Sequence, residues 1–201
     1  MLTSDQDVTA ERIRSAVAAR YSTIGANPAL EDGIPRGRAW AEQLDYPPSL
    51  LADIPSVAVE AFTGIGAPIL AADFKEGEQV LDLGCGAGMD TLLAARQLGD
   101  AGHIYAVDSA EGMIAAARRA VTTVRAENVS VIHVSAEALP IENESVDAVI
   151  VNGLFNLAPD KTAVARELMR VLRPGGRVVG AEIVLTDHRP PPALELVAWF
   201  R

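Results

Sequence analysis

The chain has 201 residues, of which 49% are hydrophobic and 22% charged, and it carries a formal net charge of −10. This composition is typical of a globular domain with a sizeable core, and the negative charge disfavours binding to nucleic acid or to an anionic membrane surface. A single cysteine, Cys85, excludes an internal disulfide framework and a cysteine-based zinc site, and it favours a reducing, cytoplasmic location. The polar N-terminus and the lack of an apolar run of about 18 residues predict neither secretion nor membrane insertion.

The N-terminal third of the chain predicts a helical cap. A helical pattern runs from Thr9, the predicted N-cap, to about Tyr21. Three of its side chains share one face: Ile13, Val17 and Tyr21. Proline and glycine then interrupt the chain repeatedly before a second helix, predicted from about Pro55 to Phe62. We interpret residues 1–74 as a cap or lid over a core formed by residues 75–201.

Further along the chain, short β-branched runs alternate with longer helical stretches rich in Ala and Leu. The predicted strands are Gln79–Leu83, His103–Val107, Val129–Val134, Val146–Val151 and Gly176–Leu185. The predicted helices are Met89–Leu98, Glu111–Arg125 and Asp160–Leu172, followed by a short terminal helix at Pro192–Phe200. Repeated strand–helix–strand units are typical of an α/β fold with a doubly wound, Rossmann-like parallel sheet, in which ligands bind at the carboxyl ends of the strands.

The densest motif follows the first predicted strand, where Asp82-Leu83-Gly84-Cys85-Gly86-Ala87-Gly88 leads into a helix. Glycines at such a turn allow a ligand to approach the backbone closely. The spacing is G-x-G-x-G, because Met89 stands where a dinucleotide-binding G-x-G-x-x-G has its last glycine. This shorter loop suits a nucleoside with an amino-acid tail. Asp82 would hold the cationic amine of that tail directly or through water.

Three further strand ends carry polar residues. Asp108 ends the second strand, 20 residues after Gly88, where a carboxylate can accept both ribose hydroxyls; its alternative role is an N-cap for the next helix. The loop Ser135–Pro140 would lie near an adenine edge, and Asn152 and Gly153 would stand beside the same site. Four strand ends are therefore expected to converge on one crevice.

These residues resemble the class I S-adenosylmethionine-dependent methyltransferases. The motifs that carry the resemblance cover about residues 75–185 and are Asp82–Gly88, Asp108, Ser135–Pro140 and Leu172–Gly176. Within that family the chain is most similar to the arsenite methyltransferases, through Thr63–Pro68, Gly84, Ala87–Asp90, Asn152 and Asn156–Leu157. The resemblance implies S-adenosylmethionine as cofactor and a transferase that acts on a small molecule.

The resemblance also implies roles for single residues. Gly84, Gly86 and Asp108 would bind the cofactor, Gly64 and Gly66 would close over its methionine end, and Ala136 and Glu137 would lie near adenine. The full set of predicted cofactor-binding residues is Gly64, Gly66, Asp82, Gly84, Cys85, Gly86, Asp108, Ser109, Met113, Ala136, Glu137 and Asn152. No catalytic residue and no metal site is assigned.

Two departures from that branch bear on function. By resemblance, arsenite methyltransferases hold arsenic(III) with several cysteines, one of them beside the asparagine where this chain has Gly153. Only Cys85 is present, so arsenite is not the expected substrate. The family sheet also carries two further strands after the fifth, which this sequence lacks. We therefore expect either a truncated chain or a partner that covers the sheet edge, for example in a homodimer.

Several reactive side chains have simpler structural interpretations. His103 and His133 fall within strands and are expected to be structural, whereas His188 follows the fifth strand at the ligand-binding edge and is the better candidate for a base. Three cap aromatics would either line a substrate pocket or attach the cap to the core: Tyr21, Trp40 and Tyr46.

Methyl transfer from a sulfonium needs alignment and exclusion of water, and the sequence identifies no general base. The leading alternative is a non-catalytic cofactor-binding subunit that pairs with another chain. The glycine spacing disfavours a nucleotide-dependent oxidoreductase, and the lack of a Gly-Lys-Ser/Thr loop disfavours an NTPase. The methyl acceptor is not predicted, because acceptor pockets in this fold are built from variable loops.

Overall fold

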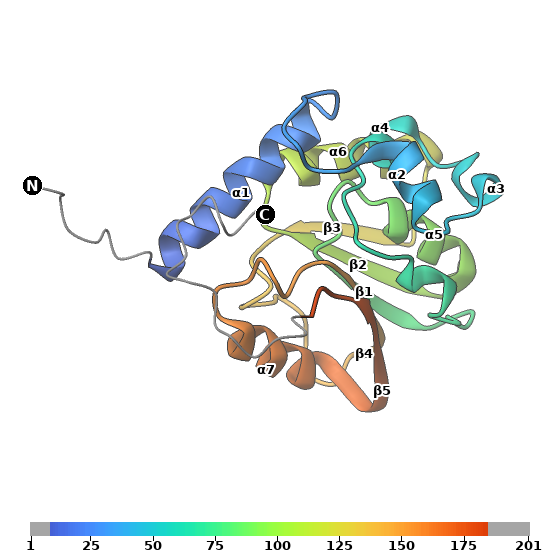
Figure 1. The fold of residues 1–201 in the computed structure, drawn as a ribbon. Helices are drawn as coiled ribbons and strands as arrows, with labels where there is room; N and C mark the ends of the chain where they lie inside the picture. The colour runs from blue at the N-terminus through green and yellow to red at the C-terminus, as the bar shows by residue number, and fades with distance from the viewer. Residues whose placement is uncertain (1–8, 185–201) are drawn as a thin grey trace, which may run out of the picture.

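The computed structural model describes residues 9–184, and its centre is a five-stranded parallel sheet with helices on both faces (Figure 1). The strands are β1 (Gln79–Leu83), β2 (His103–Asp108), β3 (Val129–His133), β4 (Val146–Asn152) and β5 (Leu172–Ala181). Their order across the sheet is β3-β2-β1-β4-β5, so the direction of winding reverses between β1 and β4. The predicted doubly wound α/β fold is therefore confirmed.

The helices before the sheet are α1 (Ala10–Ala26), α2 (Gly37–Gln43), α3 (Pro48–Leu51) and α4 (Ser56–Glu60), followed by a 3₁₀ turn, η1 (Pro68–Leu70). The helices between the strands are α5 (Met89–Leu98), α6 (Glu111–Val124) and α7 (Lys161–Val171). The bounds of α5 are those predicted. The expected helix at Pro192–Phe200 and the candidate base His188 lie outside the described residues.

The first helix is longer than predicted. It starts where expected, because the hydroxyl of Thr9 accepts a hydrogen bond from the backbone nitrogen of Arg12 at 3.3 Å. It then continues past Tyr21 to Ala26, and Ile24 in this extra stretch is fully buried. The helical pattern in the sequence is weaker after Tyr21. Packing against α6 therefore stabilises the last turn of the helix.

The last strand begins earlier than predicted, at Leu172 rather than Gly176, and ends at Ala181 rather than Leu185. Its pairing with β4 shifts register between Val146 and Ala148. This irregularity lets a strand at the sheet edge include Pro174, Gly175 and Gly176, residues that normally break a ladder.

The cap and one face of the sheet share a continuous hydrophobic core. Tyr46, Leu51 and Phe62 are buried together with Val80 of β1 and Ile150 of β4. Burial of such side chains is the main favourable contribution to folding. A domain boundary at residue 74 stays a prediction.

The opposite face of the sheet is covered by α7. Val164 and Leu168 of this helix pack against a second buried cluster that includes Leu81 and Val149. The sheet is therefore covered on both faces, as the apolar runs of its inner strands require. Within residues 9–184, no helix combines the length and apolar character needed to cross a bilayer.

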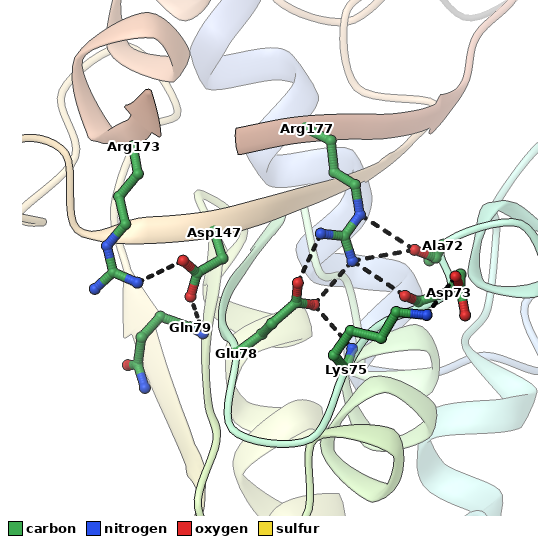
Figure 2. A network of polar contacts seen from close by, with 8 residues as sticks. All are labelled: Ala72, Asp73, Lys75, Glu78, Gln79, Asp147, Arg173 and Arg177. Atoms are coloured by element: carbon green, nitrogen blue, oxygen red, sulfur yellow. Dashed lines mark hydrogen bonds and ion pairs between the residues drawn. The ribbon is translucent and has the colours of Figure 1, made fainter. Parts of the chain in front are cut away.

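Ion pairs tie together the amino-terminal edge of the sheet (Figure 2). Arg177 of β5 contacts both carboxylate oxygens of Glu78, at 2.7 and 2.8 Å, and also donates to the carbonyls of residues 72–73. Asp147 accepts from Arg173 at 2.5 Å and from the first backbone N–H of β1 at 2.8 Å. These bonds fasten β5 to the segment that enters β1, at the end of the strands opposite their carboxyl termini.

Candidate functional site

A cavity of about 300 Å³ opens at the carboxyl ends of β1, β2 and β4. Its wall includes several residues predicted to bind the cofactor, namely Gly84, Gly86, Asp108, Ser109, Ala136, Glu137 and Asn152. The other predicted residues do not border it: Gly64, Gly66, Asp82, Cys85 and Met113. The cavity stands where the strand order reverses, which is the usual ligand site of open α/β sheets.

The turn after β1 is left-handed at its three glycines, with φ of 80° at Gly84, 53° at Gly86 and 87° at Gly88. These angles are unfavourable for residues that carry a Cβ. A Cβ on Gly84 would also lie 2.7 Å from Cδ1 of Leu154. A Cβ on Gly86 would have only the Sδ of Met113 within 4 Å, at 3.9 Å. Gly86 therefore leaves room for a ligand beside the backbone.

Asp108 ends β2 and lines the cavity. One of its carboxylate oxygens accepts from the backbone nitrogen of Gly86 at 2.9 Å, and the other accepts from that of Ala110 at 2.8 Å. Burial raises the pKa of this carboxyl, while the backbone N–H groups lower it. A carboxylate has about four acceptor positions, so the backbone N–H groups of Gly86, Ser109 and Ala110 do not exhaust them. The alternative role as N-cap does not apply, because Ala110 caps α6.

Asp82 precedes the glycine turn, Cys85 lies within it, and both residues are buried. Asp82 is buried and accepts from the hydroxyl of Thr91 at 2.5 Å. Burial, and next the charge of Asp90, raises the pKa of Asp82 to about 8. The thiol of Cys85 is packed beside Ile114, and burial raises its pKa as well. A role for Asp82 in holding an amine stays a prediction.

Gly64 and Gly66 permit close contacts within the protein itself. A Cβ on Gly64 would lie 2.5 Å from Nδ2 of Asn152, and one on Gly66 would lie 2.6 Å from Cβ of Ala181. Asn152 in turn accepts a hydrogen bond from the backbone nitrogen of Ile65 at 2.9 Å. Packing of this loop against β4 and β5 is therefore one reason for the glycines, and their contact with a cofactor stays a prediction.

One wall of the cavity comes from α1 and was largely missed by sequence analysis. Its residues are Arg14, Ser15, Val17, Ala18 and Tyr21. Figure 1 shows α1 beside α6 with its first turns extending past the sheet. Burial, followed by the charge of Asp108, raises the pKa of Tyr21, so its hydroxyl is protonated at neutral pH. Of the alternatives for Tyr21, the structure supports a pocket-lining position.

An ion pair bridges two walls of the cavity. Nε of Arg14 on α1 lies 2.6 Å from Oε2 of Glu137, in the loop after β3, and both residues line the cavity. The other oxygen of Glu137 accepts from the backbone nitrogen of Asp160 at 3.3 Å. Glu137 therefore connects the cap to the loop after β3 and to the start of α7.

The other two cap aromatics attach the cap to the core. Trp40 packs against the buried cluster that the cap shares with the sheet, and its Nε1 donates to the carbonyl of Gly64 within the cap at 2.8 Å. The hydroxyl of Tyr46 is buried and donates to Oδ1 of Asp90 at 2.6 Å. Neither aromatic residue lines the cavity.

Two histidines have structural partners. Nε2 of His103 lies 2.9 Å from Oγ of Ser130, and Nε2 of His133 lies 2.9 Å from the carbonyl oxygen of Ser109. Neither histidine borders the cavity. In the described part of the chain, no three His, Cys, Asp or Glu side chains are grouped so as to hold a metal ion.

The loop after β4 supplies an apolar wall that sequence analysis did not predict in full. Its cavity-lining residues are Gly153, Leu154, Leu157, Ala158 and Pro159. Glu182, just after β5, holds the start of this loop, because its Oε1 accepts from the backbone nitrogens of Leu154 and Phe155, each at 2.8 Å. The sequence signals for this wall were its position after a strand end and the resemblance at Asn156–Leu157.

Comparison with known proteins agrees with this geometry. A family model described as a methyltransferase domain matches residues 74–197. An arsenite methyltransferase from Halobacterium salinarum is 45% identical over 140 residues, which are 69% of this chain and 36% of that protein. A demethylmenaquinone methyltransferase from Shouchella clausii is 36% identical over 111 residues, covering 55% of this chain and 47% of that protein.

A solved structure is also similar. The crystal structure of an arsenic(III) S-adenosylmethionine methyltransferase from Chlamydomonas reinhardtii matches with a TM-score of 0.60 and 36% identity, over 66% of this chain and 48% of that one. The chain thus spans less than half the length of each of these three relatives. On its fold, its glycine turn and the match of the domain model, the chain belongs to the class I S-adenosylmethionine-dependent methyltransferases.

Proposed function

We propose that this chain binds S-adenosylmethionine in the cavity and transfers its methyl group to a small-molecule acceptor. The observation that carries the proposal is the convergence of Gly86 and Asp108, joined by a 2.9 Å hydrogen bond at the cavity wall. The Asp108 carboxylate, which lines the cavity, would accept from the ribose hydroxyls. Ala136 and Glu137, which border the same cavity, would lie near adenine.

The cavity walls suit methyl transfer. When bound, S-adenosylmethionine supplies a methyl group on a sulfonium centre. Apolar residues of α1 and of the loop after β4 line the same space and would exclude water from the reacting atoms. Tyr21, with its raised pKa, would act as a hydrogen-bond donor rather than as a base. The chain would contribute mainly alignment of the acceptor.

We infer that the acceptor is not arsenite. A soft arsenic(III) centre needs several thiolates, whereas the thiol of Cys85 is buried and has a raised pKa. Gly153 lines the cavity with φ of 80°, and a Cβ there would lie 3.3 Å from Cγ1 of Ile65. A cysteine at this position would therefore be strained and crowded. The relatives named above include both arsenite and demethylmenaquinone methyltransferases, so family membership does not select the acceptor.

The alternative is a cofactor-binding subunit without activity that pairs with another chain, which could be a second copy. It is supported by β5, which has a strand on one side only within residues 9–184, and by the exposure of Val178 on this strand. An unpaired strand edge is a ready surface for another chain.

Calorimetry tests the proposal first, with S-adenosylmethionine and NADH titrated in parallel. We expect binding of S-adenosylmethionine alone; binding of NADH alone would contradict the proposal. Methyl transfer from radiolabelled cofactor to a panel of small quinones, phenols, amines and thiols then separates an enzyme from an inactive subunit. Cofactor binding without transfer to any acceptor, together with a stable complex with a second chain, would favour the alternative.

A further inference from the structure

A buried polar cluster joins three segments of the chain, of which the end of β4 borders the cavity. Tyr46 comes from the cap, Asp90 from the first turn of α5 after the glycine turn, and Asn152 from the end of β4. Tyr46 is 1% exposed and Asp90 is 6% exposed. Oδ1 of Asp90 accepts from the Tyr46 hydroxyl at 2.6 Å, and Oδ2 accepts from Nδ2 of Asn152 at 3.0 Å. Both partners of this buried carboxylate are uncharged.

The amide of Asn152 is fully used within the chain. Its Oδ1 accepts from the backbone nitrogens of Ile65 at 2.9 Å and Gly66 at 3.2 Å. Its Nδ2 donates to the carbonyl of Gly66 at 2.9 Å and to Asp90. A side-chain amide has two donor and two acceptor positions, so all four are occupied. Asn152 borders the cavity, and its side-chain amide is engaged with the loop of residues 64–66 and with Asp90; its contact with a cofactor stays a prediction.

Only one orientation of this amide satisfies its surroundings. Exchange of Oδ1 and Nδ2 would place the NH₂ group against two backbone N–H donors and the oxygen against a carbonyl and the Asp90 carboxylate. We propose that Asp90 is a positioning residue: by accepting from Asn152, it selects the amide orientation that holds the Thr63–Gly66 segment at the cavity wall. Thr63 borders the cavity directly, as does Gly153, which follows Asn152.

The chemistry of the cluster favours this role over simple attachment of the cap. Burial of a carboxylate without a cation lowers the stability of the fold, because the charge loses its hydration. Apolar side chains would attach a loop without this loss of free energy. Burial raises the pKa of Asp90 to about 6, while its hydrogen bonds from Tyr46 and Asn152 lower it. The carboxylate is therefore an acceptor on both oxygens at neutral pH, one for the Tyr46 hydroxyl and one for the amide of Asn152.

A charge-exchange experiment tests the proposal. Asn152→Asp places two carboxylates in contact, whereas Asp90→Asn keeps one acceptor oxygen, which can face Asn152 when its NH₂ group donates to the hydroxyl oxygen of Tyr46. The double variant Asp90→Asn with Asn152→Asp again pairs an amide donor with a carboxylate acceptor. Asp147→Asn serves as the matched control, because it removes one carboxylate from the opposite edge of the sheet (Figure 2).

The first measurement needs no ligand: amide hydrogen exchange of Ile65 and Gly66, whose N–H groups donate to Asn152. We expect exchange at least tenfold faster in Asn152→Asp, near wild-type rates in Asp90→Asn and the control, and partial recovery in the double variant, in which the carbonyl of Gly66 still faces a carboxylate oxygen. Unchanged exchange in Asn152→Asp, or no recovery in the double variant, would overturn the proposal. If Asn152→Asp does not fold, Asp90→Ala gives the same test, with faster exchange expected and unchanged exchange contradicting the proposal.

The second measurement is S-adenosylmethionine affinity, and this part rests on the proposed function. We expect a Kd at least tenfold weaker in Asn152→Asp and within threefold of wild type in the double variant. If the wild-type chain binds no cofactor, the proposed function fails, whereas the exchange rates still decide the role of Asp90. If the wild type binds and Asn152→Asp binds equally well, the positioning role is wrong.

Discussion

Gly25 of α1 and Gly112 of α6 bring two helix backbones into contact. A Cβ on Gly25 would lie 2.5 Å from the backbone nitrogen of Met113, and one on Gly112 would lie 2.8 Å from Cα of Ser22. This crossing fixes the last turn of α1, whereas most residues in its first two turns are exposed. The helix is therefore anchored to the core at its carboxyl end, next to the cavity that its middle turns line.

The first prediction concerns this crossing. Gly25→Ala should lower the free energy of unfolding by about 1–3 kcal/mol, because the added methyl forces the two backbones apart. Urea denaturation measures the change. Ala19→Ser, at an exposed position of the same helix, is the control and should stay within about 0.5 kcal/mol of wild type. A Gly25→Ala variant as stable as the control would show that the helices separate without cost.

The second prediction concerns Asp108. Asp108→Ala should weaken S-adenosylmethionine binding by about 1–3 kcal/mol, through loss of charge-assisted hydrogen bonds to ribose. Calorimetry measures the affinity, and circular dichroism shows whether the variant is folded, since Asp108 also accepts from Gly86 and Ala110. Wild-type affinity in a folded variant would remove Asp108 from the cofactor site.

The third prediction concerns closure of the cap. If residues 1–74 act as a lid, cofactor binding should slow hydrogen exchange in α1, and Arg14→Ala should release the cofactor about two- to fivefold faster. An ion pair as exposed as Arg14–Glu137 contributes only about 0.2–1 kcal/mol, which sets this modest size. Arg119→Ala, on the exposed face of α6, changes the net charge equally and should not alter release. Identical exchange with and without cofactor would indicate a static cap.

The fourth prediction concerns pH. Asp82 has a raised pKa of about 8, so the folded protein holds its proton more tightly than the unfolded chain, whose Asp has a pKa of about 4. Its contribution to stability is thus complete below about pH 4 and is lost as the pH rises toward 8. The free energy of unfolding should fall over this range, and Asp82→Asn should flatten the decline. Urea titrations at half-unit pH steps measure both slopes, and equal slopes would contradict the assignment.

Glu78 gives the opposite sign and serves as an internal comparison. Its hydrogen bonds with Arg177 lower its pKa, so its contribution is present above about pH 4.5 and is lost as the pH falls. Glu78→Gln should therefore weaken the protein most at neutral pH and have little effect in strong acid. The decline attributed to Asp82 should persist in this variant.

The fifth prediction concerns arsenite. Incubation of the chain with arsenite, S-adenosylmethionine and a reducing thiol should yield no methylated arsenical by mass spectrometry, while the cofactor still binds. Gly153→Cys should not confer the activity, because the position is left-handed and close to Ile65. Further cysteines in a longer form of the chain would still leave this position without a thiol. If the wild-type chain forms methylarsenicals and the Asp108→Ala variant does not, the inference from the number of cysteines is wrong.

The sequence predicted what depends on local pattern. The bounds of α5 and the meeting of Gly86 with Asp108 follow from strand periodicity and from a glycine turn that determines where the next helix starts. The apolar face of α1 was also predicted. Its position at the cavity was not predicted for Val17, and for Tyr21 it was one of two alternatives. Val17 and Tyr21 line the cavity instead of packing fully into the core, and periodicity alone does not distinguish these two surroundings.

Contacts between distant segments were beyond sequence analysis. Asn152 bonds to Ile65 across 87 positions, and Arg14 pairs with Glu137 across 123. Nothing in either local sequence specifies such a partner. The start of β5 was missed for a related reason, because proline and glycine indicate a break unless a neighbouring strand absorbs the irregularity.

The ion pairs of Figure 2 also bear on how such a domain can diversify. Arg177 and Glu78 secure β5 at the amino-terminal edge of the sheet, whereas Gly153 to Pro159 shape the cavity at the other edge. Substitutions in the loop after β4 therefore leave the fastening of the sheet intact. The lining of the cavity can change at one edge without eroding the stability provided by the other, which makes this chain a suitable starting point for directed evolution of ligand binding.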